Sequence, residues 1–411
     1  MPHVKAILSN FFERNLFERI IVYIFMSELL VKIIFELIIG QWSFIQSQNK
    51  QWIFYIFLAL DYVLSVKKVT NIRVSVNPTS LLAFVFFIMV VHGLFIGLML
   101  GNAPFVILND TIPVLMIGLN ILRMQSVAEY KPPDLRFLLY FCSYITLGTA
   151  FFGYVAALIG QQSGPSIPAE AIYLPLFFAA LFTVKPFPKW ILGLVVVMIA
   201  VTSDDLNRTT MAFLAIVMFG YVLFDMVKNP AKGVITLVVL LSVLAVAVHV
   251  VPEDSKTYRR VIGLTEIDLS KKTGSIGERQ EEWRAIVKKE YEKGKTVEMF
   301  GLGFGGVYEV ARTHEFLKNY GHAHYSWAWF KLRFGDVGFV YLLIFAVTLL
   351  YNGFIWSVRC MQGNVEGLFV VFLCLISLLY CVTYVNAVLL MMGIQFIYYR
   401  PDGFVQNAVS K

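Results

Sequence analysis

Long runs of hydrophobic residues alternate with short charged or Pro/Gly-rich breaks along most of this chain. A helix of about 20 apolar residues is long enough to cross a hydrocarbon core of about 30 Å. The pattern therefore predicts an all-α integral membrane protein with about twelve spans, several of them short. We place the spans near 17–40, 52–66, 80–101, 104–123, 136–160, 172–185, 189–203, 209–227, 233–251, 336–357, 365–384 and 386–399.

One hydrophilic segment, residues 252–326, interrupts this pattern ahead of the last three spans. We divide the chain into helices 1–9 (1–251), a large loop ending in an interfacial helix (252–335), and helices 10–12 with the C-terminus (336–411). Inside the loop, Ser275-Ile-Gly-Glu278 has the form of a capping box and Gly294 that of a helix stop, which predicts a helix over 276–293.

The predicted loop helix has an apolar stripe with one arginine on it. Arg279 precedes the stripe's first residue by four positions and so lies on the same face. The apolar members are Trp283, Ile286, Val287 and Tyr291. A merely solvated arginine would more often lie on the opposite face.

The end of the loop, residues 325–334, interleaves aromatic residues with two cations, a pattern typical of a helix lying at the membrane surface. Its members are Trp327, Trp329, Phe330, Lys331 and Arg333. Gly335 and Gly338 then allow a sharp bend into the next span.

Composition strengthens the membrane interpretation. The 411 residues are 58% hydrophobic and 15% charged, with a mean hydropathy of +0.71, which excludes a soluble enzyme and a single-pass receptor. The net charge of +7 reflects topology rather than nucleic-acid binding, because the cations cluster on alternate connections. With a cytoplasmic N-terminus, the short outer connections hold only Lys50 and Arg208. Both termini are then expected in the cytoplasm and the large loop outside.

Several other signals carry little chemistry. The four cysteines have no metal-ligand spacing, and the Gly301–Gly306 GxGxxG pattern lacks a surrounding βαβ unit, so we expect a turn there. Asp204 and Asp205 lack partner carboxylates in the first outer loop. We therefore expect no metal and no cofactor.

Some charged or polar residues lie within the predicted spans. Glu28, Lys32 and Glu36 recur every four residues, which predicts a structural ion ladder. The sequence leaves open what Asp61 and His92 contact.

Four motifs follow one another along the chain: Asn207-Arg208 outside a mid-chain span, Gly277-x-Arg279-x3-Trp283 with the following Gly301-Leu-Gly303, His324-x10-Gly335-x2-Gly338, and the large loop before the last three spans. In their order and sidedness they resemble the bacterial superfamily of O-antigen ligases and O-antigen or exopolysaccharide polymerases. One residue departs from the ligase pattern, because Tyr325 follows the histidine where Asn, Ser or Gln is usual.

The resemblance implies a GT-C-like, metal-independent glycosyltransferase of the bacterial inner membrane, with its active site on the periplasmic face. Its donor would be a glycan on undecaprenyl diphosphate, and its acceptor a hydroxyl of a lipid-linked repeat or of lipid A-core. Membrane lipids and a chain-length regulator protein are further expected partners, and nucleic acid is not.

The resemblance also assigns roles to residues. Arg208 and Arg279 would hold the diphosphate, because a guanidinium binds phosphate oxygens bidentately. His324 would accept the proton of the attacking hydroxyl, and further substrate contacts are expected from His322, Tyr325 and Arg312. The bland alternatives are an interfacial anchor for Arg208, a local ion pair with Glu278 or Glu282 for Arg279, and a capping role for His324, with His322 in its place.

Within the superfamily we favour the repeat-unit polymerase, which must accommodate two lipid diphosphates. Tyr325 and a surplus of outer cations favour it; these cations are Arg259, Arg260, Arg312, Lys331 and Arg333. The alternatives are an O-antigen ligase, a protein O-glycan transferase and, from other classes, a secondary transporter or a membrane scaffold without chemistry. The transporter class is disfavoured by the large loop and by the absence of visible duplicated halves.

Overall fold

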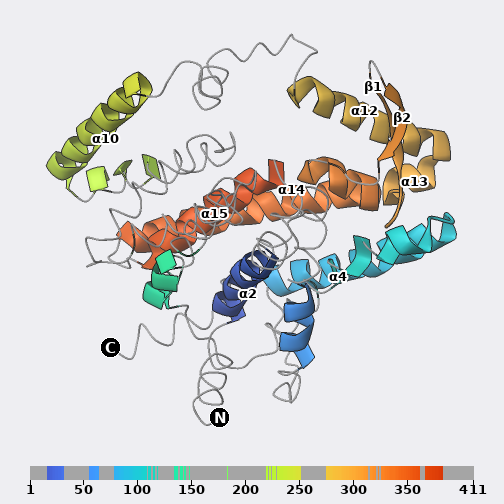
Figure 1. Cartoon of the computed structure of the whole chain (residues 1–411), viewed down its shortest axis with the longest axis horizontal. Helices are drawn as coiled ribbons and strands as arrows, with labels where there is room; N and C mark the ends of the chain where they lie inside the picture. The colour runs from blue at the N-terminus through green and yellow to red at the C-terminus, as the bar shows by residue number, and fades with distance from the viewer. Residues whose placement is uncertain are drawn as a thin grey trace, which may run out of the picture.

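The computed structural model describes residues 16–31, 55–63, 78–108, 229–250, 275–312, 315–320, 325–361 and 366–382. Single residues and short stretches are also described between 110 and 148, at 183, between 219 and 227, and at 323. These residues are mostly helical, and their strands form one two-stranded sheet (Figure 1). The predicted helical fold is confirmed for this part of the chain.

Two of the described helices, α4 (Pro78–Met99) and α14 (Ser326–Met361), are long and apolar enough to cross a membrane. In each helix only 33% of the most apolar stretch is buried inside the protein, whereas the core helix of a soluble protein would be mostly buried. Both helices expose large hydrophobic side chains, among them Phe84, Phe95, Leu343 and Phe354. These features indicate a membrane protein.

Other helices coincide with predicted spans but do not test their number. α2 (Leu16–Val31), the helical residues 55–63, α10 (Pro230–Val250) and α15 (Glu366–Val382) overlap the spans near 17–40, 52–66, 233–251 and 365–384. The spans predicted at 189–203 and 386–399 lie outside the described residues, and so do Lys32 and Glu36.

The question left open by Asp61 is answered by α2. Arg19 Nε lies 3.0 Å from Asp61 Oδ1, and the Tyr23 hydroxyl donates to the same carboxylate at 2.8 Å. One turn along, the rings of Tyr23 and Phe57 stack with their centroids 5.6 Å apart. Residues later in α2 contact residues earlier in 55–63, so the two helices run antiparallel. The buried ion pair lies at one end of their contact.

α4 and α14 also pack antiparallel. The Tyr341 hydroxyl donates to the Leu82 carbonyl at 3.0 Å, while the ring of Phe334 lies against Gly93 near the other end of α4. α15 packs along α14, where Gly353 lies against the side chain of Cys374. These three helices pack together (Figure 1).

The hydrophilic loop is folded against one end of this helix pair. It contains α12 (Ser275–Lys293), α13 (Lys295–Phe300), β1 (Tyr308–Arg312) and β2 (Glu315–Tyr320), which we call together the loop unit (275–320). The predicted helix 276–293 and its stop at Gly294, which has a φ of 100°, are confirmed. The antiparallel hairpin of β1 and β2 was not predicted.

The predicted apolar stripe of α12 is partly wrong. Ile286 is fully buried, but its neighbours on the buried face are the carboxylates Glu282 and Glu290. Val287 is 37% exposed and Tyr291 76% exposed. The buried face is thus rotated toward two acidic residues that were not part of the predicted stripe.

The bend predicted between the 325–334 segment and the next span is confirmed. α14 is interrupted at Gly335, whose φ of 62° and ψ of −149° are not helical. A Cβ at Gly335 would overlap the backbone of Met299 and Gly301, so a side chain here is excluded both by conformation and by space.

Candidate functional site

The glycine-rich stretch 301–306, called here the glycine turn, connects the loop unit to α4 and α14. Gly301, Gly303 and Gly305 all have positive φ values, between 67° and 80°. The amide of Leu302 donates to the Leu332 carbonyl of α14 at 2.8 Å, and the amide of Phe304 donates to the Gly93 carbonyl of α4 at 3.0 Å. The turn predicted from the GxGxxG pattern is confirmed, and its glycines serve close backbone packing.

The surface of α4 is shaped to receive this turn. A Cβ at Gly97 would overlap the carbonyl oxygen of Phe304, so only glycine permits this approach. Just beyond α4, the side-chain amide of Asn102 donates to the carbonyls of Leu302 and Phe304, each at 2.9 Å. The connection that follows α4 therefore lies at the same end of the helix pair as the loop unit.

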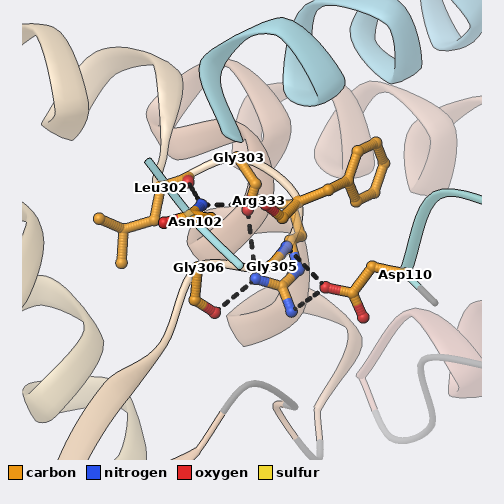
Figure 2. Close-up of polar contacts among 8 residues, drawn as sticks. Asn102, Asp110, Leu302, Gly303, Gly305, Gly306 and Arg333 are labelled. Carbon is orange, nitrogen blue, oxygen red and sulfur yellow. Dashed lines mark hydrogen bonds and ion pairs between the residues drawn. The ribbon is translucent and has the colours of Figure 1, made fainter. Parts of the chain in front are cut away.

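Arg333 is the centre of this junction (Figure 2). Its side chain is fully buried and donates to the carbonyls of Gly303 at 3.2 Å and Gly306 at 2.7 Å. Its other terminal nitrogen lies 2.6 Å from Asp110 Oδ2, an oxygen that also accepts from the amide of Gly305 at 2.9 Å. One guanidinium thus joins α14, the glycine turn and the helical residues after α4.

Lys331 is held in a second buried cluster. Its ammonium lies 3.1 Å from Glu290 Oε2 in α12 and pairs with Asp336 beyond the kink. Burial raises the pKa of Glu290 to about 8, although the nearby Lys331 ammonium acts to lower it. On the same face of α12, the Tyr308 hydroxyl of β1 donates to Glu282.

These contacts correct the prediction that 325–334 lies at the membrane surface. Trp329, Phe330, Lys331 and Arg333 are all buried inside the protein. The alternation of rings and cations arises because the rings pack on α4 and the glycine turn, while the cations meet carboxylates from distant segments. Neither Lys331 nor Arg333 is therefore available to bind a substrate phosphate.

An aromatic contact links the middle of α12 to the start of α14. The rings of Trp283 and Trp327 lie 4.4 Å apart, and Trp327 in turn stacks on Tyr325 with centroids 5.5 Å apart. Arg279 precedes Trp283 by one helical turn, an axial distance of about 6 Å. The turn of α12 that holds Arg279 is thus brought close to the segment that holds Tyr325.

The predicted site residues differ in how far the structure describes them. Tyr325 is half-buried, and Arg279 and Arg312 are placed in α12 and at the end of β1, where Arg312 is paired in register with Glu315. His324, His322 and Arg208 lie outside the described residues. Ala323 and Ser326, on either side of the His324–Tyr325 dipeptide, are fully buried.

The sequence reading missed the residues that build this junction, namely Asn102, Asp110, Glu282 and Glu290. Asp110 had a detectable signal, since it is a carboxylate inside a predicted span and needs a partner there. Within the described ranges, no group of three or more His, Cys, Asp or Glu side chains could hold a metal ion, and Asp204 and Asp205 lie outside these ranges.

His92 is the other polar residue of a predicted span whose contacts the sequence left undetermined. Its ring centroid lies 4.9 Å from that of Phe300 at the end of α13. It belongs to the packing between α4 and the loop unit.

No family model matches this chain, and no curated protein matches it either.

Proposed function

We propose that the protein is a multi-pass glycosyltransferase of a bacterial inner membrane, acting on its periplasmic face. The acceptor hydroxyl attacks the anomeric carbon of a glycan on undecaprenyl diphosphate. A new glycosidic C–O bond forms, the C–O bond to the diphosphate breaks, and the hydroxyl proton passes to His324. The lipid diphosphate leaves with its charge held by Arg208 and Arg279.

The observation that carries this proposal is the aromatic contact between α12 and α14. Trp283, Trp327 and Tyr325 bring the turn with Arg279 near the segment that directly follows His324 in the sequence. In the sequence these positions belong to two separate motifs of the resembled superfamily. The residues that bind the phosphates and the residue that accepts the proton must all reach the same substrate, so they must lie close together. This contact supports such an arrangement.

Buried polar contacts supply the rigidity that such a site needs. Arg333 with Asp110, and Lys331 with Glu290, attach the loop unit to helices that are apolar enough to span the membrane. A site on a loop of this length would otherwise lose positional accuracy. The contacts of Asn102 with the glycine turn also support the proposed topology, in which both segments are on the outer side.

We favour the repeat-unit polymerase, and the O-antigen ligase is the second candidate. Two of the outer cations no longer support the polymerase, because Lys331 and Arg333 are buried against carboxylates and do not reach a second diphosphate. What remains is Tyr325, whose ring stacks on Trp327 instead of presenting a small polar side chain, together with Arg312 and the undescribed Arg259 and Arg260.

The test is deletion of the gene in its host, with the surface polysaccharide separated on a gel. A polymerase predicts that the ladder collapses to core bearing a single repeat, and that a His324→Ala copy fails to restore it while a parental copy succeeds. Core without any repeat, with long chains accumulating on the lipid carrier, would identify a ligase. An unchanged ladder would overturn the proposal.

A further inference from the structure

The part of α14 beyond its kink exposes one continuous apolar face. Positions spaced by three or four residues lie on one side of a helix. Here that side exposes Phe339, Leu343, Val347, Leu350 and Phe354. Since α14 is long and apolar enough to cross a membrane, this face is the one that meets lipid.

α12 carries a shorter apolar stripe on one flank of its buried face. Trp283, Val287 and Tyr291 follow one another every four residues, and the last two are 37% and 76% exposed. The opposite side of the helix is exposed and charged, with Glu281, Arg284, Lys288 and Glu292. α12 therefore has three faces: one buried in protein, one charged, and one exposed and apolar.

The two apolar surfaces meet at one ring contact. Trp283 lies with its ring centroid 6.2 Å from that of Phe339, the first exposed aromatic residue of α14 beyond the kink. α12 itself lies beside the first part of α14 (Figure 1). The stripe of α12 is thus a continuation of the face that α14 presents to lipid.

We propose that α12 rests against the phospholipid bilayer through Val287 and Tyr291. The partner is lipid rather than protein because the stripe continues a membrane-spanning face, and because it ends in a tyrosine, a residue enriched at the membrane–water interface. The charged side of α12 remains in water. The membrane-surface role that the sequence pattern assigned to 325–334 belongs instead to this flank of α12.

This contact goes beyond the proposed function and holds whatever reaction the protein performs. It has one consequence that does rest on the proposed function. Arg279 lies one turn before Trp283, so a lipid-bound α12 holds Arg279 near the depth at which the phosphates of a lipid carrier lie.

The test is spin-label accessibility on the full chain in vesicles of phosphatidylethanolamine and phosphatidylglycerol. Single cysteines at Val287 and Tyr291 are labelled, with Val347 on α14 as the lipid-facing control and Lys288 as the water-facing control. The native Cys360, Cys374 and Cys381 are buried, and the unmodified chain measures the background labelling. We expect the ratio of oxygen to nickel-chelate collision rates at 287 and 291 to match Val347 and exceed Lys288.

Two results would overturn the proposal. A ratio like that of Lys288 would place the stripe in water, and labels shielded from both oxygen and nickel would show that protein, such as a second copy of the chain, covers it. Neither result depends on glycosyl transfer, so failure here is separable from failure of the proposed function, which the polysaccharide gel measures.

Discussion

Replacing the buried Arg333 with methionine is expected to destabilise the folded chain strongly. The substitution keeps the length of the side chain but removes the charge. Asp110 then keeps the Gly305 amide as a partner but loses the guanidinium, and the carbonyls of Gly303 and Gly306 lose their Arg333 donor. Removing one member of a buried ion pair costs about 3–5 kcal/mol, chiefly because the other charge stays buried.

The structure places this substitution toward the lower end of that range. Arg333 is fully buried, but the Asp110 side chain is 18% exposed and so retains some contact with solvent. We expect a loss of about 3 kcal/mol, and a fall in the midpoint of thermal unfolding of roughly 5 °C or more. A thiol-reactive dye that reports exposure of the buried Cys360, Cys374 and Cys381 measures this midpoint in detergent.

The matched control and the double variant make the reasoning refutable. Arg359 lies on the same helix over the ring of Trp356 and is only half-buried, so Arg359→Met should cost less than about 1 kcal/mol. Combining Arg333→Met with Asp110→Leu should cost clearly less than the two single losses together, because neither charge is then left alone. Strict additivity, or equal losses at Arg333 and Arg359, would refute the buried pair.

The other predictions concern the glycine turn, the loop unit and the proposed site. Gly97→Ala should destabilise the chain by about 1–3 kcal/mol, because its Cβ overlaps the Phe304 carbonyl, while Gly353→Ala, which has ordinary contacts, should be nearly neutral in the same dye assay. The raised pKa of Glu290 means that the folded protein binds a proton more tightly than the unfolded chain. Its contribution to stability is therefore full below about pH 4.5 and lost as pH rises toward about 8, so thermal scans of Glu290→Gln should show a flatter pH dependence than the parent; a parallel dependence would contradict this. Arg279→Lys should impair glycan transfer nearly as much as Arg279→Ala, since a point charge does not replace a bidentate fork; near-normal transfer by the lysine variant would exclude the diphosphate role. Transfer should survive EDTA, and a loss that Mg²⁺ or Mn²⁺ restores would contradict metal independence.

Local signals predicted part of this structure well. The capping box at Ser275 and the glycine at 294 fixed both ends of α12, and Gly335 marked the kink in α14. Each of these features depends on the conformational preference of one residue or of a few neighbours, so a single sequence contains the information.

The parts that were missed depend on contacts between distant segments. From its neighbours in the sequence Arg333 was predicted to be an interfacial cation. Its actual partner, Asp110, lies far earlier in the chain. In the same way, the buried Glu282 and Glu290 have partners, Tyr308 and Lys331, that lie in other segments of the chain. The hairpin was not predicted because β1 and β2 are short and contain charged residues, and no glycine-containing turn separates them.

The most direct test of the central proposal is release of undecaprenyl diphosphate by the purified full chain. The protein is reconstituted in vesicles with an undecaprenyl-diphosphate-linked repeat, and both the released lipid diphosphate and the glycan length are followed over time. We expect release coupled to lengthening of the glycan in the parent chain, and loss of both in His324→Ala. No release from the parent chain with its host's own lipid-linked repeat, or equal release by the His324→Ala variant, would contradict the account.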